Sequence, residues 1–396
     1  MDEIRLMASP LSGVRIVDLT SIVLGPYGTQ MLGDAGADII KVEPPGGEMT
    51  RSIGPHRSPD QSAYYANLNR NKRSLVLDLK QADARAALLR VIEGADVFVH
   101  NMRAGAAARL GLDAATLLAR QPKLIHASAS GFRLGSSKQD DPAFDDLIQG
   151  MCGLATLNGT AADGPRYVPS VMADKISGHT LATAITMALF ARERSGVGQA
   201  LHVPMLDTML AFLLPEHLWG KTIDDADAGL GYPRLMTPHR RPYATKDGYL
   251  CIIAATDEQW QRLFTLLGRP ELIADPRFAD LGTRTTHIDA LYGVVAEMLP
   301  TRATAEWLTL LAKADLPHGP AHTLESLFDD PYMQEVNAFP RFQHPTEGEI
   351  TMIAPSVDFA GTPLAIRTGA PGLGAHSAEI LREAGLSDAE IGALAA

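Results

Sequence analysis

The sequence contains few cysteines and no long apolar run. Among its 396 residues only Cys152 and Cys251 are cysteines, so no disulfide framework is available and nothing indicates secretion. The most apolar stretch, over 172–192, is interrupted by charged residues, which argues against a membrane-spanning helix. The N-terminal segment lacks the apolar region of a signal peptide. We therefore expect a soluble, cytoplasmic protein with no membrane partner.

Positive charge is also scarce. The chain has 35 Lys and Arg residues against 46 Asp and Glu residues, a formal net charge of −11. This balance argues against a nucleic-acid partner, because nucleic-acid binding begins with neutralising phosphates. It does not exclude a local basic pocket for one phosphorylated ligand. The content of 46% hydrophobic and 20% charged residues is typical of a globular protein, and the length predicts two domains.

Several catalytic motifs are missing. The turn Leu24–Gly28 lacks the G-x-G-x-x-G spacing, and Pro26 removes an N–H that a pyrophosphate needs, so a nicotinamide-dependent dehydrogenase is only a weak alternative. The segment Ala127–Gly131 lacks the first glycine and the central serine of a G-x-S-x-G elbow. His318 and His322 lie between prolines and glycines rather than on one helix face, so we predict no metal site.

The first half of the chain alternates short β-branched runs with segments of helical periodicity. This alternation predicts an α/β fold with a doubly wound, mainly parallel, Rossmann-like sheet. The expected strands cover 14–19, 37–42, 74–79, 96–100, 124–128 and 200–204, and the expected helices begin at 26 and cover 82–93, 114–120 and 171–193.

A polar, glycine-rich interval at 221–232 marks a boundary between domains. It is followed by a strand at 248–253 and by helices at 257–267, 287–298 and 303–314. After 339 the chain returns to extended segments and a last helix near 377–383. We predict a large domain formed by 1–220 and 335–396, and a small α+β domain formed by 221–334.

Asp174 lies at the start of the predicted long helix. Unpaired N–H groups and the positive end of the helix dipole favour an ionised carboxylate there. Such a group suits a covalent nucleophile. An aspartate at this position is more often only a helix cap, so both roles stay open.

Basic residues gather locally despite the acidic total. Lys80 and the segment 101–103 follow predicted strands at their carboxyl ends, where ligands bind in such sheets. Together with Arg109 they can neutralise the phosphates of a nucleotide-bearing ligand. The basic segment 70–73 lies at the opposite end of its strand and is expected to be a solvated turn.

Arg240 and Arg241 precede the strand of the small domain. They are able to bind a substrate carboxylate in a bidentate manner, or to pair with Asp224, Asp225 and Asp227 as a charged linker. These two interpretations are of equal weight.

The order and spacing of many short segments resemble the family III CoA-transferases, a family that includes the α-methylacyl-CoA racemases. The likeness extends over nearly the whole chain. The segments concerned are 11–19, 33–43, 71–80, 95–101, 108–112, 275–278, 316–320 and 373–377.

The resemblance implies that Asp174 is the catalytic nucleophile and that a CoA thioester is a substrate, with no permanently bound cofactor and no metal. The partners implied are an acyl-CoA and a free carboxylic acid, together with a second copy of the chain in an interlocked homodimer. CoA contacts are implied for Val23, Leu24, Leu77, Asp78, Leu79, Lys80, Asn101, Met102, Arg103, Arg109, Phe144 and Asp145.

Departures from the family pattern refine this hypothesis. Pro44-Pro45 stands where some members have an arginine, Val23 where some have a glutamine, and only Gly229–Gly231 remains of a mobile glycine loop. Phe144 replaces the histidine that racemases use, and a racemase needs a second base. We therefore favour CoA transfer, with a dicarboxylate acceptor bound by Arg240 and Arg241, over racemisation or CoA binding without activity.

Overall fold

The structure, a computed structural model, describes residues 9–159 and 163–395. These residues divide into two compact units, which are described separately. The first contains the chain up to Gly159, then Asp163–Phe212 and the part from Glu335 onward, and the second contains Leu213–Gln334. Within the described residues, no helix is both long and apolar enough to cross a bilayer.

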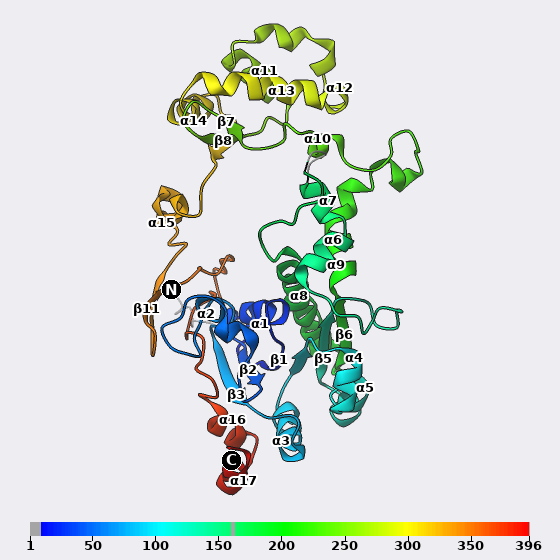
Figure 1. The fold of residues 1–396 in the computed structure, drawn as a ribbon, viewed down its shortest axis with the longest axis vertical. Coiled ribbons are helices and arrows are strands. Elements are labelled where there is room, and N and C mark those ends of the chain that lie inside the picture. The colour runs from blue at the N-terminus through cyan, green and yellow to red at the C-terminus, as the bar shows by residue number, and fades with distance from the viewer. Residues whose placement is uncertain (1–8, 160–162, 396) are drawn as a thin grey trace, which may run out of the picture. The chain divides into compact units, whose positions relative to one another are not determined.

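A six-stranded parallel sheet forms the centre of the first unit (Figure 1). Its order is β3-β2-β1-β4-β5-β6, the doubly wound arrangement expected from the sequence. The strands are β1 (Arg15–Leu19), β2 (Asp38–Glu43), β3 (Lys72–Val76), β4 (Val97–His100), β5 (Ile125–Ser130) and β6 (Gln199–Pro204). In such a sheet the ligand crevice lies where the strand order reverses, here between β1 and β4.

The third strand was predicted two to three residues too late. It pairs with β2 from Ile39↔Lys72 to Glu43↔Val76. The N–H of Leu77 donates to the carbonyl of Glu43, which is the last residue of β2. Pro44 follows, so β3 has no partner strand beyond this point. Lys80 therefore lies in the turn before the next helix, not at the end of a strand.

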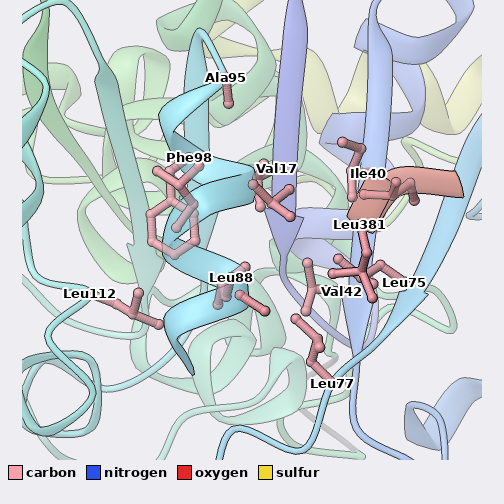
Figure 2. Packing of buried hydrophobic residues seen from close by; sticks show 14 of the residues in the cluster. Val17, Ile40, Val42, Leu75, Leu77, Leu88, Ala95, Phe98, Leu112 and Leu381 are labelled. Carbon is pink, nitrogen blue, oxygen red and sulfur yellow. The ribbon is translucent and has the colours of Figure 1, made fainter. Parts of the chain in front are cut away.

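The two faces of the sheet have different chemistry, because successive side chains of a strand point to opposite faces. One face carries the main apolar cluster of the core. There Val17, Val42 and Leu75 pack with Leu88 and with Leu381 from the C-terminal segment (Figure 2). The opposite face carries the buried charges Asp18, Lys41 and Lys72.

The helices of the first unit are α1 (Leu24–Asp34), α2 (Ala63–Ala66), α3 (Ala82–Glu93), α4 (Ala104–Arg109), α5 (Ala114–Arg120), α6 (Asp145–Met151), α7 (Leu154–Asn158), α8 (Met172–Ser195), α16 (Ser377–Glu383) and α17 (Asp388–Ala395), with the 3₁₀ turn η1 (Met49–Ser52). α9 (Met205–His217) begins in this unit and ends in the second. The tail also forms α15 (Pro331–Glu335) and the hairpin β10 (Arg341–His344) and β11 (Gly348–Thr351).

Two glycines let α1 and α8 cross with their backbones in contact. A Cβ on Gly28 would lie 2.7 Å from the carbonyl oxygen of Gly178, and one on Gly178 would lie 2.6 Å from that of Leu24. Gly178 is one helical turn after Asp174, so the two share a face of α8. The crossing therefore places Asp174 beside the start of α1.

The second unit combines a small antiparallel sheet with helices, as predicted. The sheet contains β7 (Tyr243–Ala244), β8 (Tyr249–Ile252) and β9 (His318–Pro320). Its helices are α10 (Pro233–Met236), α11 (Asp257–Leu266), α12 (Leu281–Thr286), α13 (Ile288–Met298) and α14 (Thr304–Lys313), with 3₁₀ turns η2 (Trp219–Ile223), η3 (Pro270–Ala274), η4 (Pro276–Phe278), η5 (Leu299–Thr301) and η6 (Ser326–Asp329). Trp260, Phe264 and Trp307 are buried in its own core.

Candidate active site

A cavity of about 330 Å³ opens at the carboxyl ends of β1, β4 and β5, at the point where the strand order reverses. Its wall combines the turn after β1, the segment after β4, the turn after β5 and the first turn of α8. The lining residues are Ser21, Ile22, Leu24, Met49, Asn101, Arg103, Ala129, Ser130, Gly131, Gln139, Asp141, Pro142, Ala143, Phe144, Asp174 and Met205. The position is where doubly wound sheets bind their ligands.

Asp174 is the third residue of α8 and lines this cavity. Its backbone N–H donates to Oδ1 of Asp145, at 3.0 Å, so the buried carboxylate of Asp145 satisfies one of the free N–H groups of the helix. The Asp174 side chain does not cap its own helix. No described residue donates a hydrogen bond to its carboxylate oxygens, and no described cation pairs with them.

The expectation that the helix terminus keeps Asp174 ionised is wrong. Burial, and then the nearby charge of Asp145, raise the pKa of Asp174 to about 7. The N–H groups of Met172, Asp174 and Lys175 at this helix end donate to other acceptors and not to the Asp174 carboxylate. The pKa of this carboxyl group therefore lies near neutral pH instead of at its ordinary value of 3.8.

Sequence reasoning missed two residues that hold this arrangement. Gln149 is fully buried and donates through Nε2 to Asp145 Oδ2 and to the carbonyl of Ser170, and its Oε1 accepts from the N–H of Val168. It thus ties α6 to the segment that enters α8. Burial, and then the nearby charges of Asp174 and Asp145, raise the pKa of the Tyr64 phenol. Neither residue belongs to a local motif, so no pattern in the sequence points to them.

The residues predicted to bind CoA fall into separate places. Leu24, Asn101, Arg103 and Phe144 line the cavity of Asp174. The segment Leu77–Lys80 lines a neighbouring cavity of about 350 Å³, with Leu19, Glu43 and Pro44, at the carboxyl ends of β1 to β3.

Three of these residues do not present their side chains to the cavity of Asp174. Val23 is 1% exposed, and Asp145 is buried as the first residue of α6 rather than part of a loop. Met102 instead lines a cavity of about 200 Å³ beside His100 and His126. A ligand in the Asp174 cavity therefore meets only part of the predicted set.

Three predicted cations are exposed at this edge of the sheet. Lys80, Arg103 and Arg109 form no ion pair with any described residue, so their charges are available to a ligand. The basic segment 70–73, which leads into β3, is not the solvated turn that was predicted. Arg70 and Lys72 are buried and pair with Asp34, at 2.6 Å, and Asp18, at 3.2 Å.

Arg240 and Arg241 lie in the second unit, before β7, and both are exposed. Among the described residues neither forms an ion pair, and Asp224 pairs instead with Lys221. Their binding of a substrate carboxylate stays a prediction. In the part of the chain that the structure describes, no group of three or more His, Cys, Asp or Glu side chains is placed to hold a metal ion.

The sequence profile of CoA-transferase family III matches residues 11–377, nearly the whole chain. The chain belongs to this family. Acetyl-CoA:oxalate CoA-transferase of Acetobacter aceti is 37% identical over 317 residues, which cover 78% of this chain and 80% of that protein. Succinate–glutarate CoA-transferase of Agrobacterium fabrum is 32% identical over 94% of this chain and 95% of its own length.

Solved structures agree with this assignment. The crystal structure of Rv3272 from Mycobacterium tuberculosis has a TM-score of 0.81 and 31% identity, and the match covers 94% of this chain and 99% of that one. A CaiB/BaiF family protein from Brucella suis has a TM-score of 0.80 and 30% identity, with 96% of this chain and 100% of that one covered. The predicted membership of the CoA-transferase family, and with it CoA-transferase activity, is confirmed.

Proposed function

We propose that this CoA-transferase moves CoA from an acyl-CoA to a free dicarboxylic acid, with Asp174 as the covalent carrier. The observation that supports this most directly is the Asp174 carboxylate, which lines the cavity at the carboxyl edge of the sheet and binds no cation and no hydrogen-bond donor among the described residues. A purely structural carboxylate in a buried position is normally paired. An unpaired one is free to react.

The proposed chemistry has four balanced steps. The Asp174 anion attacks the thioester carbonyl, the C–S bond breaks, and CoA thiolate leaves an acyl-aspartyl anhydride. The retained thiolate attacks the aspartyl carbonyl, which forms an aspartyl-CoA thioester and frees the donor acid. The acceptor carboxylate attacks this thioester and again expels thiolate. The thiolate takes the new acyl group from the second anhydride and restores the Asp174 anion.

Each of these attacks builds negative charge on a carbonyl oxygen, which backbone N–H groups can stabilise. Gly150, Gly153 and Gly159 do not line the cavity of Asp174, whereas Gly131 does. Gly131 is therefore the first position at which we propose a donor.

Mass spectrometry tests the covalent step. The protein is incubated with an acyl-CoA and then with hydroxylamine or borohydride, and the peptide that contains residue 174 is analysed. We expect modification of Asp174 in the wild type. Asp141 is the matched control, since it lines the same cavity and is ion-paired with Lys138 at 3.2 Å. An unmodified Asp174, or labelling that Asp141→Asn removes and Asp174→Asn does not, would overturn the proposal.

The acceptor proposal rests on Arg240 and Arg241 and on the relatives, whose names include oxalate, glutarate and mesaconate. All three are dicarboxylates, and an arginine binds a carboxylate with two parallel hydrogen bonds. We expect Arg240→Ala and Arg241→Ala to raise the KM for a dicarboxylate acceptor and to leave that for a monocarboxylate unchanged. Equal acceptor KM values in the wild type and both variants contradict this.

The CoA-binding proposal rests on the three exposed cations of the sheet edge. Lys80, Arg103 and Arg109 have no acidic partner among the described residues, and CoA carries phosphates. We expect alanine at each position to raise the KM for acyl-CoA several-fold and to weaken its salt dependence. Arg120, paired with Glu93 on the exposed side of α5, is a control that leaves this KM unchanged.

Two other activities are separated in the same reaction mixture. A racemase exchanges the α-proton of an acyl-CoA with solvent deuterium, a transferase moves CoA to a free acid, and an inactive binder does neither. Phe144 lines the cavity where a second base would be needed, and a hydrocarbon ring cannot accept a proton. We expect transfer without α-deuterium incorporation.

We also propose that the protein works as an interlocked homodimer. Met187 and Phe190 of α8 are 66% and 64% exposed, which is unusual for large apolar side chains on a protein that works alone. Sedimentation should give twice the chain mass of 42.4 kDa. A monomer at micromolar concentration contradicts the proposal.

A further inference from the structure

The turn after β1 contains a strained residue on the wall of the active-site cavity. Ile22 has φ 70°, a left-handed conformation that a β-branched side chain rarely adopts. Such strain persists only where the surroundings enforce it, and it concentrates at functional sites. Ile22 also lines the cavity of Asp174.

Side chains from three other segments hold this turn through its backbone. The Thr20 carbonyl accepts from Lys41 Nζ at 3.1 Å, and the Thr20 N–H donates to Asp18 at 2.9 Å. Asn101 accepts from the Ser21 N–H at 3.1 Å and donates to the Ser21 carbonyl at 2.9 Å. Side chains of neighbouring segments therefore hold the backbone of Thr20 and Ser21 in place.

Glu48 supplies the contact at the strained residue itself. Its Oε2 accepts from the Ile22 N–H at 2.9 Å. Its Oε1 accepts from Thr50 Oγ1 at 2.7 Å and lies 3.3 Å from Lys41 Nζ. Glu48 is only 7% exposed and is not among the residues that line the cavity.

We propose that Glu48 is a positioning residue for the reaction: its carboxylate holds Ile22 in the left-handed conformation and so sets the cavity wall that faces Asp174. The geometry connects the two, because Leu24, at the end of the same turn, is in backbone contact with Gly178 on the Asp174 face of α8. The inference rests on the proposed role of Asp174.

The test compares three variants. Glu48→Gln keeps the shape but offers one acceptor oxygen where two are used, and Glu48→Asp keeps the charge beside Lys41 but is too short to reach Ile22. We expect both to lower kcat about 10- to 100-fold, because small misplacements at a reacting centre have effects of that size, and to change the KM for acyl-CoA less than threefold. The control is Asp34→Asn, which breaks a buried ion pair with Arg70 at the far end of α1.

Substitutions of Ile22 separate strain from simple loss of stability. Glycine adopts the left-handed conformation at no steric cost, whereas alanine removes the same side chain and keeps the strain. We expect Glu48→Gln to reduce kcat in the Ile22→Ala background and to have less than a threefold effect in the Ile22→Gly background. Equal effects of Glu48→Gln in both backgrounds overturn the proposal. The control Asp34→Asn should leave kcat unchanged, and an unchanged kcat in Glu48→Gln also overturns the proposal.

A crystal structure of Glu48→Asp gives a readout that does not depend on activity. We expect φ of Ile22 to return to negative values, and a φ that stays near 70° overturns the inference. If the wild type is never labelled at Asp174, the proposed function fails, but this structural result still decides whether Glu48 holds the turn. If Asp174 is labelled at the same rate in the wild type and in Glu48→Asp, only the positioning role fails.

Discussion

Two aspartates of the first unit, the buried Asp18 and the half-buried Asp174, have opposite surroundings. Asp18 is fully buried on the polar face of the sheet, and burial alone would raise its pKa, but Lys72, Lys41 and two threonine hydroxyls outweigh that effect and lower it. Asp174 is less buried, yet burial and the charge of Asp145 raise its pKa to about 7. The comparison shows that the partners of a carboxylate, more than its depth, decide whether it stabilises the fold or stays available to react.

The largest effect on activity is expected when the unpaired carboxylate, Asp174, is removed. Asp174→Asn should lower transfer activity by on the order of 10³-fold or more, because it deletes the proposed nucleophile. Steady-state kinetics with an acyl-CoA and a free acid measure this. Asp141→Asn should retain activity, and a comparable loss there would show that any carboxylate of the cavity matters equally.

The same substitution should also stabilise the fold above neutral pH. The pKa of Asp174 is about 7 in the folded protein and 3.8 in the unfolded chain. The free energy of unfolding therefore falls as the pH rises from 3.8 to 7, and the whole loss of stability remains above pH 7. Asp174→Asn should therefore gain little at pH 4 and on the order of 4 kcal/mol at pH 8. Urea unfolding at both pH values measures it, and a pH-independent gain contradicts it.

Asp18, the paired carboxylate, should show the opposite effect on stability when its partner is removed. Lys72→Met leaves Asp18 buried without its nearest cation, at a cost of about 3–5 kcal/mol. The double variant Asp18→Asn with Lys72→Met removes both charges and should recover much of that loss. Chemical unfolding tests both, and a Lys72→Met protein as stable as the wild type would mean that Asp18 is not held by this pair.

A smaller effect is expected in the pH profile. In the proposed mechanism Asp174 attacks as an anion, so kcat/KM should rise with pH through about 7. Asp145→Asn removes the like charge, and the midpoint should move to lower pH. The move should be less than the whole displacement from 3.8, since burial is the larger cause. An unchanged midpoint would show that Asp145 acts only through its hydrogen bond to the Asp174 N–H.

The smallest effect belongs to a carboxylate that is paired but exposed. Arg120 and Glu93 lie 2.8 Å apart with side chains 49% and 55% exposed. Arg120→Ala should change the unfolding free energy by less than about 1 kcal/mol, because solvent already screens the pair. A loss as large as that of Lys72→Met would mean that exposure does not weaken such pairs.

Much of the fold could be predicted because its pattern is local. The alternation of β-branched runs and helical periodicities gave β1, β2, β4, α3 and α8 within a few residues of their observed bounds. The error at β3 came from a neighbour, since Pro44 ends β2 and removes the partner strand. The helices α4 and α9 were not predicted, because their sequences have no clear apolar period.

The sequence by itself determined the parallel sheet, the family and the position of Asp174 at the start of α8, because each depends on residues adjacent in the chain or on their order. Only the tertiary structure decided which buried charges have an oppositely charged partner and which do not. Lys72 meets Asp18 across 54 positions of sequence, and Asp145 meets the Asp174 N–H across 29. Electrostatic energies follow distance in space and exclusion of water, and no local pattern encodes either.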